Sequence, residues 1–230
     1  MYGMMPYYNS NGFWMIALLL AMAFGLIAQM KIKSTYARYA KVPNNKNITG
    51  MQAAREILDR NGLADIKIVP ISGELTDHYD PTKNIIRLSE RVYNDPSIAS
   101  VSIAAHEVGH AIQHDRGYAF LNVRNSLVPV VNFASRSIYP LLLVGLFISP
   151  FFINVAIAVF AVTVLFQIVT LPVEIDASSR ALENLDGTIL QREELPEGKR
   201  VLSAAAMTYI AAALFSLVQL LRLMNSRRDN

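Results

Sequence analysis

The fold is decided by Leu127–Val173, which reads LVPVVNFASRSIYPLLLVGLFISPFFINVAIAVFAVTVLFQIVTLPV and contains Arg136 as its only charge. A helix of this length would be about 70 Å long, whereas a bilayer core is about 30 Å thick. Ser149-Pro150 lies near the middle, and proline and the residue before it disfavour continuous helix. The run therefore predicts a transmembrane hairpin, roughly 127–148 and 151–173. Arg136 is then expected either at the membrane interface or facing a polar cavity inside the protein.

Two other apolar runs have the length of a membrane crossing. Phe13–Met30 carries no charge and is closed by Lys31 and Lys33. No basic region precedes it and no small-residue cleavage site follows, so it is expected to be a retained anchor rather than a signal peptide. Val201–Leu221 is a fourth candidate span. Together these runs predict a multi-pass protein of the cell membrane with about four transmembrane helices.

Basic residues near the span ends predict the orientation. Residues 1–12 have no lysine or arginine, whereas four follow the first span: Lys31, Lys33, Arg38 and Lys41. Basic residues favour the cytoplasmic side, so residues 31–126 and 174–200 are expected in the cytoplasm. The three arginines at 222, 227 and 228 disagree, because a full last crossing would leave them outside. Either the last segment does not fully cross, or the charge rule is weak here.

Composition restricts the partners and the metal ligands. The net charge is only +3, and no basic stripe with interleaved aromatic residues indicates nucleic acid. The lipid bilayer is therefore an expected partner, and nucleic acid is not. The chain has no cysteine, so any metal must be bound by His, Asp or Glu.

The polar segments between the spans have the patterns of folded structure. Thr49 is a suitable cap for a helix to about Asn61, and residues 66–71 alternate like a strand. Residues 75–79 and 85–88 flank a turn and predict a β-hairpin. Asp95-Pro96 is expected to begin a helix that runs to about Asp115, with Asp95 as its cap. The predicted fold class is α+β: a mainly helical membrane protein with a small β-sheet.

The predicted helix after Asp95 contains His106-Glu107-Val108-Gly109-His110. Two histidines four residues apart project from one helix face, so both imidazoles can bind one metal ion. Glu107 would lie beside the open coordination position as a general base. Small apolar residues precede the motif, as expected for a buried active-site helix. The pattern therefore predicts one catalytic Zn²⁺ and metal-dependent hydrolysis, against the alternative of two histidines that share a helix face by chance.

A third ligand is expected after the hairpin, at Glu174. His114 lies about 12 Å along the helix from His106 and is expected to have a supporting or solvent-facing role. Glu174 ends a long uncharged run, and small residues at 177, 178 and 181 allow its helix to approach the HEVGH helix closely. Asp176 points elsewhere on a helix, so it is the second choice as a ligand and is expected to be solvated or to support the ligands. Two crossings, unlike one, return Glu174 to the same side of the membrane as His106.

Longer strings of sequence resemble a known family. The strings are Lys31-Ile32-Lys33-Ser34, Asp77-His78-Tyr79-Asp80-Pro81, Ala104–His114 around HEVGH, and Leu171–Ser178. They are similar to the YugP-like neutral zinc metallopeptidases of bacterial membranes, and the resemblance covers nearly the whole chain. The order of motif, hairpin and acidic helix also resembles the heat-shock membrane metalloproteases, which are gluzincins. Those enzymes have Asp where this chain has Ser178, and a hydroxyl orients a histidine more weakly than a carboxylate does.

The resemblance implies a gluzincin-type endopeptidase, and a specific substrate does not follow from it. The expected function is that of a membrane-anchored zinc metalloendopeptidase whose substrates are proteins or peptides, among them membrane proteins. The resemblance also implies a zincin-like catalytic domain, in which substrate lies extended along an edge strand beside the metal. The hairpin at 75–88 would supply this edge, and His78 and Tyr79 would then flank the cleft. The alternative for these two residues is exposure to solvent or lipid headgroups. The expected organisation is an anchor (1–30), a catalytic portion (31–126), the hairpin (127–173), a segment with the third ligand (174–200), and a last helix with a basic tail (201–230).

Two other functions fit parts of the pattern. An intramembrane protease of the site-two type also combines HExxH with membrane spans, but no Asn-Pro-Asp-Gly string follows in a later span. A non-enzymatic membrane scaffold with a structural metal would have no use for Glu107 beside the histidines. Gln113 and Arg116 occupy the positions where a metzincin needs Gly and His, which excludes that class.

Overall fold

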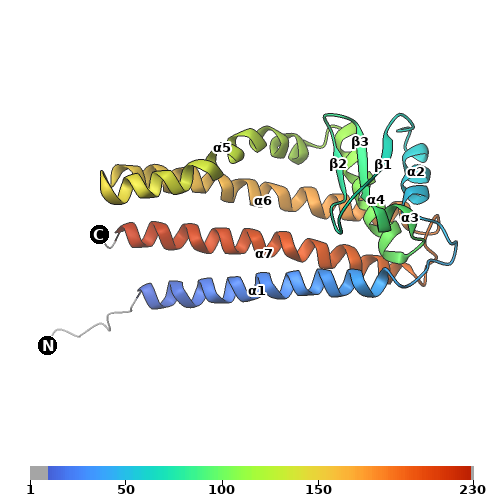
Figure 1. Cartoon of the computed structure of the whole chain (residues 1–230), viewed down its shortest axis with the longest axis horizontal. Helices are drawn as coiled ribbons and strands as arrows, with labels where there is room; N and C mark the ends of the chain where they lie inside the picture. The colour runs from blue at the N-terminus through green and yellow to red at the C-terminus, as the bar shows by residue number, and fades with distance from the viewer. Residues whose placement is uncertain (1–9, 229–230) are drawn as a thin grey trace.

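The structure, a computed structural model, describes residues 10–228. The first nine residues of the predicted anchor segment and the last two of the predicted tail lie outside this range. Four long helices dominate the described chain: α1 (Ser10–Tyr39), α5 (Ala119–Phe147), α6 (Phe151–Leu185) and α7 (Leu195–Arg228). Each is long and apolar enough to cross a membrane. They run side by side, and the sheet and short helices gather at one end of them (Figure 1). The predicted mainly helical fold with about four spans is confirmed.

The outer surfaces of the long helices are apolar. Phe133, Leu146 and Phe147 on α5 are 71%, 71% and 79% exposed. Soluble proteins rarely expose such continuous apolar surface, so these side chains are suited to lipid. Arg136 is also exposed on α5, which excludes the predicted alternative that it faces a polar cavity inside the protein.

The hairpin between α5 and α6 breaks at 148–150, as predicted. Both helices, however, are longer than the predicted crossings. α6 continues through Pro172 to Leu185, although an interior proline removes one backbone hydrogen bond. The residues after it, Val173, Ala177 and Ala181, are buried, and this packing offsets the cost of the proline. One continuous helix therefore connects the membrane hairpin to the predicted third ligand.

The part beside the membrane helices is a small α+β unit. It consists of α2 (Gly50–Arg60), β1 (Lys67–Ile71), β2 (His78–Asp80), β3 (Ile85–Ser89), α3 (Glu90–Asn94) and α4 (Ile98–Asp115). The strand order is β1-β3-β2, with β1 parallel and β2 antiparallel to β3. The predicted hairpin is confirmed, but β2 begins only at His78. Asp77 accepts a hydrogen bond from the Ser89 backbone N–H at 2.7 Å, so a side chain replaces strand pairing there.

The start of α4 differs from the prediction. Its N-cap is Ser97, whose hydroxyl accepts a hydrogen bond from the Ser100 N–H at 3.1 Å. Asp95 instead ends α3, so its predicted role as the cap of α4 is wrong. The Asn44 N–H donates to Pro96 O and the Ile98 N–H donates to Val42 O, so residues 96–98 lie next to the end of α1. The helix therefore begins at Ile98 rather than at Pro96. α4 ends at Asp115, and Gly117 follows with φ +62°, a conformation that favours glycine.

Candidate metal centre

Three potential ligands converge between α4 and α6. His106 and His110 lie on one face of α4, and Glu174 lies on α6. Glu174 Oε2 is 3.3 Å from His106 Nε2 and 3.7 Å from His110 Nε2. Within the described residues, these three form the one His/Asp/Glu group whose ligand atoms all lie within 4.8 Å of one another. The structure thus brings together the three residues that the sequence predicted as metal ligands.

The spacing of these atoms fits a tetrahedral ion. Ligand bonds of about 2.0–2.1 Å in tetrahedral geometry separate neighbouring ligand atoms by about 3.3–3.4 Å. The two measured distances to Glu174 are close to this value. Nitrogen and oxygen ligands of this kind suit zinc and several other divalent ions. The donor set therefore fits the metal that the motif implies.

Both histidines are oriented by hydrogen bonds to their other ring nitrogen. His106 Nδ1 lies 3.2 Å from Ser178 Oγ, and His110 Nδ1 lies 3.0 Å from Gln113 Oε1. Such contacts set the tautomer that leaves Nε2 free for a metal. Ser178 thus occupies the position that the predicted supporting role requires, although it is a hydroxyl rather than a carboxylate.

Gln113 is fully buried and uses its whole amide. Its Oε1 faces His110, and its Nε2 donates to Val173 O at 2.8 Å and to Asp176 Oδ2 at 2.7 Å. Arg180 donates to the same Asp176 oxygen at 2.6 Å. Asp176 therefore lies outside the ligand group and acts on His110 through Gln113. The sequence does not indicate this role of Gln113, because a glutamine in an amphipathic helix has no distinguishing pattern.

Gly109 allows α4 and α6 to touch. A Cβ at this position would lie 2.5 Å from Ala177 O and 3.1 Å from Ala177 Cα. Only glycine therefore permits this separation, and the small residue at 177 completes the contact. The predicted small face of α6 packs as expected, but the matching residue on α4 is the glycine inside the HEVGH string itself.

Glu107 lies between the ligand group and the sheet edge. The residue is 7% exposed, and its Oε2 accepts a hydrogen bond from the Tyr79 backbone N–H at 3.0 Å. β2 is an edge strand, so the side of Tyr79 that faces away from β3 faces Glu107. The acid of the HEVGH motif therefore adjoins both the ligand atoms and a strand edge.

Neither His114 nor His78 joins the ligand group. His114 Nδ1 lies 2.9 Å from the Tyr79 hydroxyl. Burial, with smaller effects of Asp80 and Asp115, raises the pKa of Tyr79 to about 12, so this hydroxyl stays protonated. His78 Nδ1 donates to Thr76 O at 2.8 Å, and its ring lines the cavity above the ligands. His78 and Tyr79 thus flank the site, while His114 supports Tyr79.

The electrostatics of the ligand group suit a cation. Burial alone would lower the pKa of His110, but hydrogen bonding and charge from Glu174, and the charge of Glu107, raise it on balance. Burial also raises the pKa of Asp77, which is further raised by the charge of Glu107 and lowered by hydrogen bonds from Ser89. The carboxylates of Glu174 and Glu107, which act on the His110 imidazole, thus create a negative potential where a metal ion would bind.

A cavity of about 210 Å³ opens over the ligands, and two residues in its wall were not found from the sequence. Arg124 of α5 lines this cavity, and its Nε is buried with no hydrogen-bond partner among the described residues. Tyr209 of α7 lines it too, and also lines an apolar cavity of about 140 Å³ beside Glu107. Both residues belong to membrane-length helices, and their contacts with the cavity depend on packing between distant segments, which the local sequence does not reveal.

These features define a class: a helical membrane protein in which a buried His-His-Glu group can hold a metal. Residues 14–228 match the family described as "Putative neutral zinc metallopeptidase", so the chain belongs to that family. The chain is 48% identical over 218 residues to "Putative membrane protease YugP" of Bacillus subtilis (strain 168), covering 91% of this chain and 96% of that protein. No solved structure matches. The family resemblance predicted from the sequence is confirmed.

Proposed function

We propose that this protein is a zinc metalloendopeptidase anchored in the membrane, with Glu107 as its general base. His106, His110 and Glu174 would hold one Zn²⁺, and Glu107 is not needed for that task. The observation that carries the proposal is the position of Glu107, which lines the same cavity as His106, His110 and Glu174. A bound ion supplies Lewis acidity, which makes water nucleophilic near neutral pH. Glu107 would take the proton from that water and deliver it to the leaving amine.

The edge strand supports an extended peptide as the substrate. β2 pairs with β3 on one side only, and the Tyr79 N–H on its other side points to Glu107. A peptide that adds to this edge as a further strand would pass the ligand group in extended form. The apolar cavity beside Glu107, lined by Ile103 and Leu202 among others, would accept an apolar substrate side chain. Membrane proteins with apolar segments near the bilayer surface are therefore the proposed substrates.

Arg124 and Tyr209 are proposed donors to the substrate carbonyl oxygen. Both line the cavity that contains the ligand atoms, and Arg124 Nε has no partner among the described residues. A charged donor in a partly dry cavity would stabilise the negative charge that develops on that oxygen. Arg124→Gln should lower kcat/KM about 10²- to 10³-fold without loss of zinc. Arg136→Gln, on the outer surface of the same helix, is the matched control and should leave kcat/KM unchanged.

Glu107→Gln tests the proposed mechanism directly. The substitution keeps the shape of the side chain and removes the base, so cleavage should fall about 10²- to 10⁴-fold while zinc stays bound. Zinc content by elemental analysis and cleavage of an unstructured membrane-tethered substrate give the two readouts. Retained cleavage would reject Glu107 as the base. Cleavage confined to transmembrane segments would instead favour the site-two type, and bound zinc with no cleavage of any substrate by the wild type would favour a scaffold.

We further propose that the metal centre faces the cytoplasm. The absence of native cysteine allows a single thiol to report its own side of the membrane. Lys83 lies in the exposed turn after β2, and Ile148, which is 75% exposed, lies at the tip of the α5–α6 hairpin. The two single variants are Lys83→Cys and Ile148→Cys. In intact cells, an impermeant maleimide should label Cys at 148 and not at 83. The reverse pattern would overturn the proposed orientation.

A further inference from the structure

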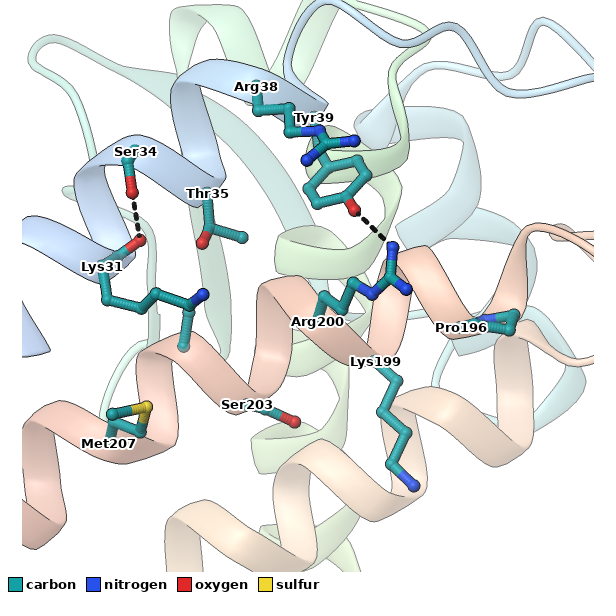
Figure 2. A pocket seen from close by; sticks show the side chains of 11 residues that line it. Lys31, Ser34, Thr35, Arg38, Tyr39, Pro196, Lys199, Arg200, Ser203 and Met207 are labelled. Atoms are coloured by element: carbon teal, nitrogen blue, oxygen red, sulfur yellow. Dashed lines mark hydrogen bonds between the residues drawn. The ribbon is translucent and has the colours of Figure 1, made fainter.

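A cavity of about 860 Å³ lies between the first and last membrane helices, away from the metal ligands. α1 contributes Lys31 and Arg38 to its lining, and α7 contributes Lys199 and Arg200. Figure 2 shows these side chains around the cavity, with Ser34, Thr35 and Ser203 between them. Four cationic residues and four hydroxyl groups, that of Tyr39 included, thus line one space, and among the described residues no acidic side chain lines it.

The positive charge in this cavity is only partly offset by the described part of the chain, where the charge of Glu197 acts on Arg200. None of the four basic residues forms an ion pair there. The two arginines contact Tyr39. Arg200 Nη1 donates to the Tyr39 hydroxyl at 3.1 Å, and the Arg38 guanidinium lies 5.4 Å from the centre of the Tyr39 ring. Like charges that line one open cavity repel one another, so an anion bound among them would stabilise the arrangement.

The depth of the cavity indicates where this anion comes from. Lys31 directly follows the uncharged run 13–30 of α1, and Lys199 and Arg200 directly precede the apolar run 201–221 of α7. Both helices therefore leave the bilayer core at the level of the cavity, which is where lipid phosphates lie. One turn further into the span the lining becomes apolar, at Ala204 and Met207. On the α7 side, a cationic end and an apolar end match the junction of a phospholipid headgroup with its glycerol and acyl chains, while Lys31 of α1 lies at the same end as Met207 (Figure 2).

We propose that this cavity binds the phosphate-bearing headgroup of an anionic phospholipid, which connects α1 to α7. Basic pockets between transmembrane helices bind such headgroups in general. α7 also carries Tyr209 in the wall of the metal-centre cavity. The lipid would thus stabilise the pairing of α1 with α7, the helix that contributes Tyr209 to the metal-centre cavity. Lipid binding here would not depend on peptidase activity, because this cavity and the metal-centre cavity share no lining residue.

Two pairs of substitutions separate a defined site from general surface charge. Lys31→Gln with Arg38→Gln removes two cations that line the cavity, whereas Lys33→Gln with Lys41→Gln removes two cations of the same segment that do not line it; all four side chains are exposed. The full chain is placed in nanodiscs of phosphatidylcholine with increasing phosphatidylglycerol, and bound phosphatidylglycerol is measured by native mass spectrometry. About fivefold weaker binding per lining cation predicts a loss of roughly 25-fold for the first pair. The second pair should stay within about twofold of wild type.

A third variant and a soluble anion complete the test. Ser203→Phe fills the cavity but keeps every charge, and it should also abolish selective binding of phosphatidylglycerol. Thermal unfolding in phosphatidylcholine alone verifies that each variant is folded. Equal losses in both charge pairs, or no preference for phosphatidylglycerol in the wild type, would overturn the proposal. Stabilisation by inorganic phosphate in neutral nanodiscs, equal to that by phosphatidylglycerol, would assign the cavity to a soluble phosphate and overturn the lipid.

Discussion

The contact between α4 and α6 differs sharply from that between α1 and α7. In the first, a glycine touches backbone and a buried glutamine uses every amide atom. In the second, the helices enclose part of an 860 Å³ cavity and of a second cavity of about 290 Å³. Close packing holds three ligand atoms at fixed spacing, because dense interiors resist displacement. Open packing leaves room for molecules that enter from the membrane. The α4–α6 contact thus positions the candidate ligands rigidly, whereas the α1–α7 contact leaves space for molecules from the membrane.

Gly109→Ala should break the tight contact and give the largest effect. The added methyl group would lie 2.5 Å from Ala177 O, which is backbone and cannot rotate away. α6 must then move, and Glu174 moves with it, so zinc binding should be lost. Overpacking of this kind costs about 1–3 kcal/mol in the free energy of unfolding. Zinc content and thermal unfolding are the measurements. Gly25→Ala on α1 is the control, since no atom lies within 4 Å of its Cβ position.

Wild-type zinc content in Gly109→Ala would contradict this account of the helix contact. It would mean that α6 adjusts without displacing the ligand carboxylate. Loss of zinc in Gly25→Ala would equally contradict it, because the open contact would then be as sensitive as the tight one.

Gln113→Leu should give the next largest effect, because it keeps the volume and removes the amide. His110 Nδ1, Val173 O and Asp176 would each lose a hydrogen-bond partner in a buried place. Removal of a partner that orients a ligand histidine typically lowers metal affinity 10- to 100-fold. A competitive zinc-chelator titration measures the change. Gln52→Leu is the control, since Gln52 belongs to the capping box of α2, away from the ligands; an equal loss there would show that stability, not His110, is responsible.

The sequence predicted the three candidate ligands and Ser178, but it did not predict every other residue that supports them. His106, His110 and Glu174 follow from helical periodicity and from the length of an apolar run, both of which are local properties. Gln113, Arg124 and Tyr209 act through contacts between distant segments, and nothing in their neighbourhoods marks them. The start of α4 was misplaced for the same reason: Asp95-Pro96 has the composition of a helix start, but hydrogen bonds from residues 42–44 hold it extended. Local patterns thus predict elements, and long-range packing decides where they end.

Ser178→Ala should give a smaller effect than Gln113→Leu. A single hydrogen bond to His106 Nδ1 is removed, and a neutral hydroxyl orients an imidazole only weakly. Zinc affinity should fall about 3- to 10-fold, measured by the same titration. Ser179→Ala is the adjacent control, because the Ser179 hydroxyl bonds only to Ile175 O on the exposed side of α6. Ser178→Asp should restore or increase affinity, since a carboxylate holds the ring more strongly; a further decrease would show that the position does not orient His106.

Tyr79→Phe should give the smallest effect, although Tyr79 directly adjoins Glu107. The hydrogen bond to Glu107 comes from the backbone N–H, which phenylalanine retains. The lost hydroxyl contacts are with Asn84 and His114, each at 2.9 Å, and their removal should cost about 1 kcal/mol in the free energy of unfolding. Chemical denaturation measures that cost, while zinc content and kcat/KM should stay near wild type. A large fall in kcat/KM with unchanged stability would show that the hydroxyl acts on substrate. The strand edge would then act through its side chains as well as its backbone, and the rigid part of the site would extend from the α4–α6 contact to the sheet.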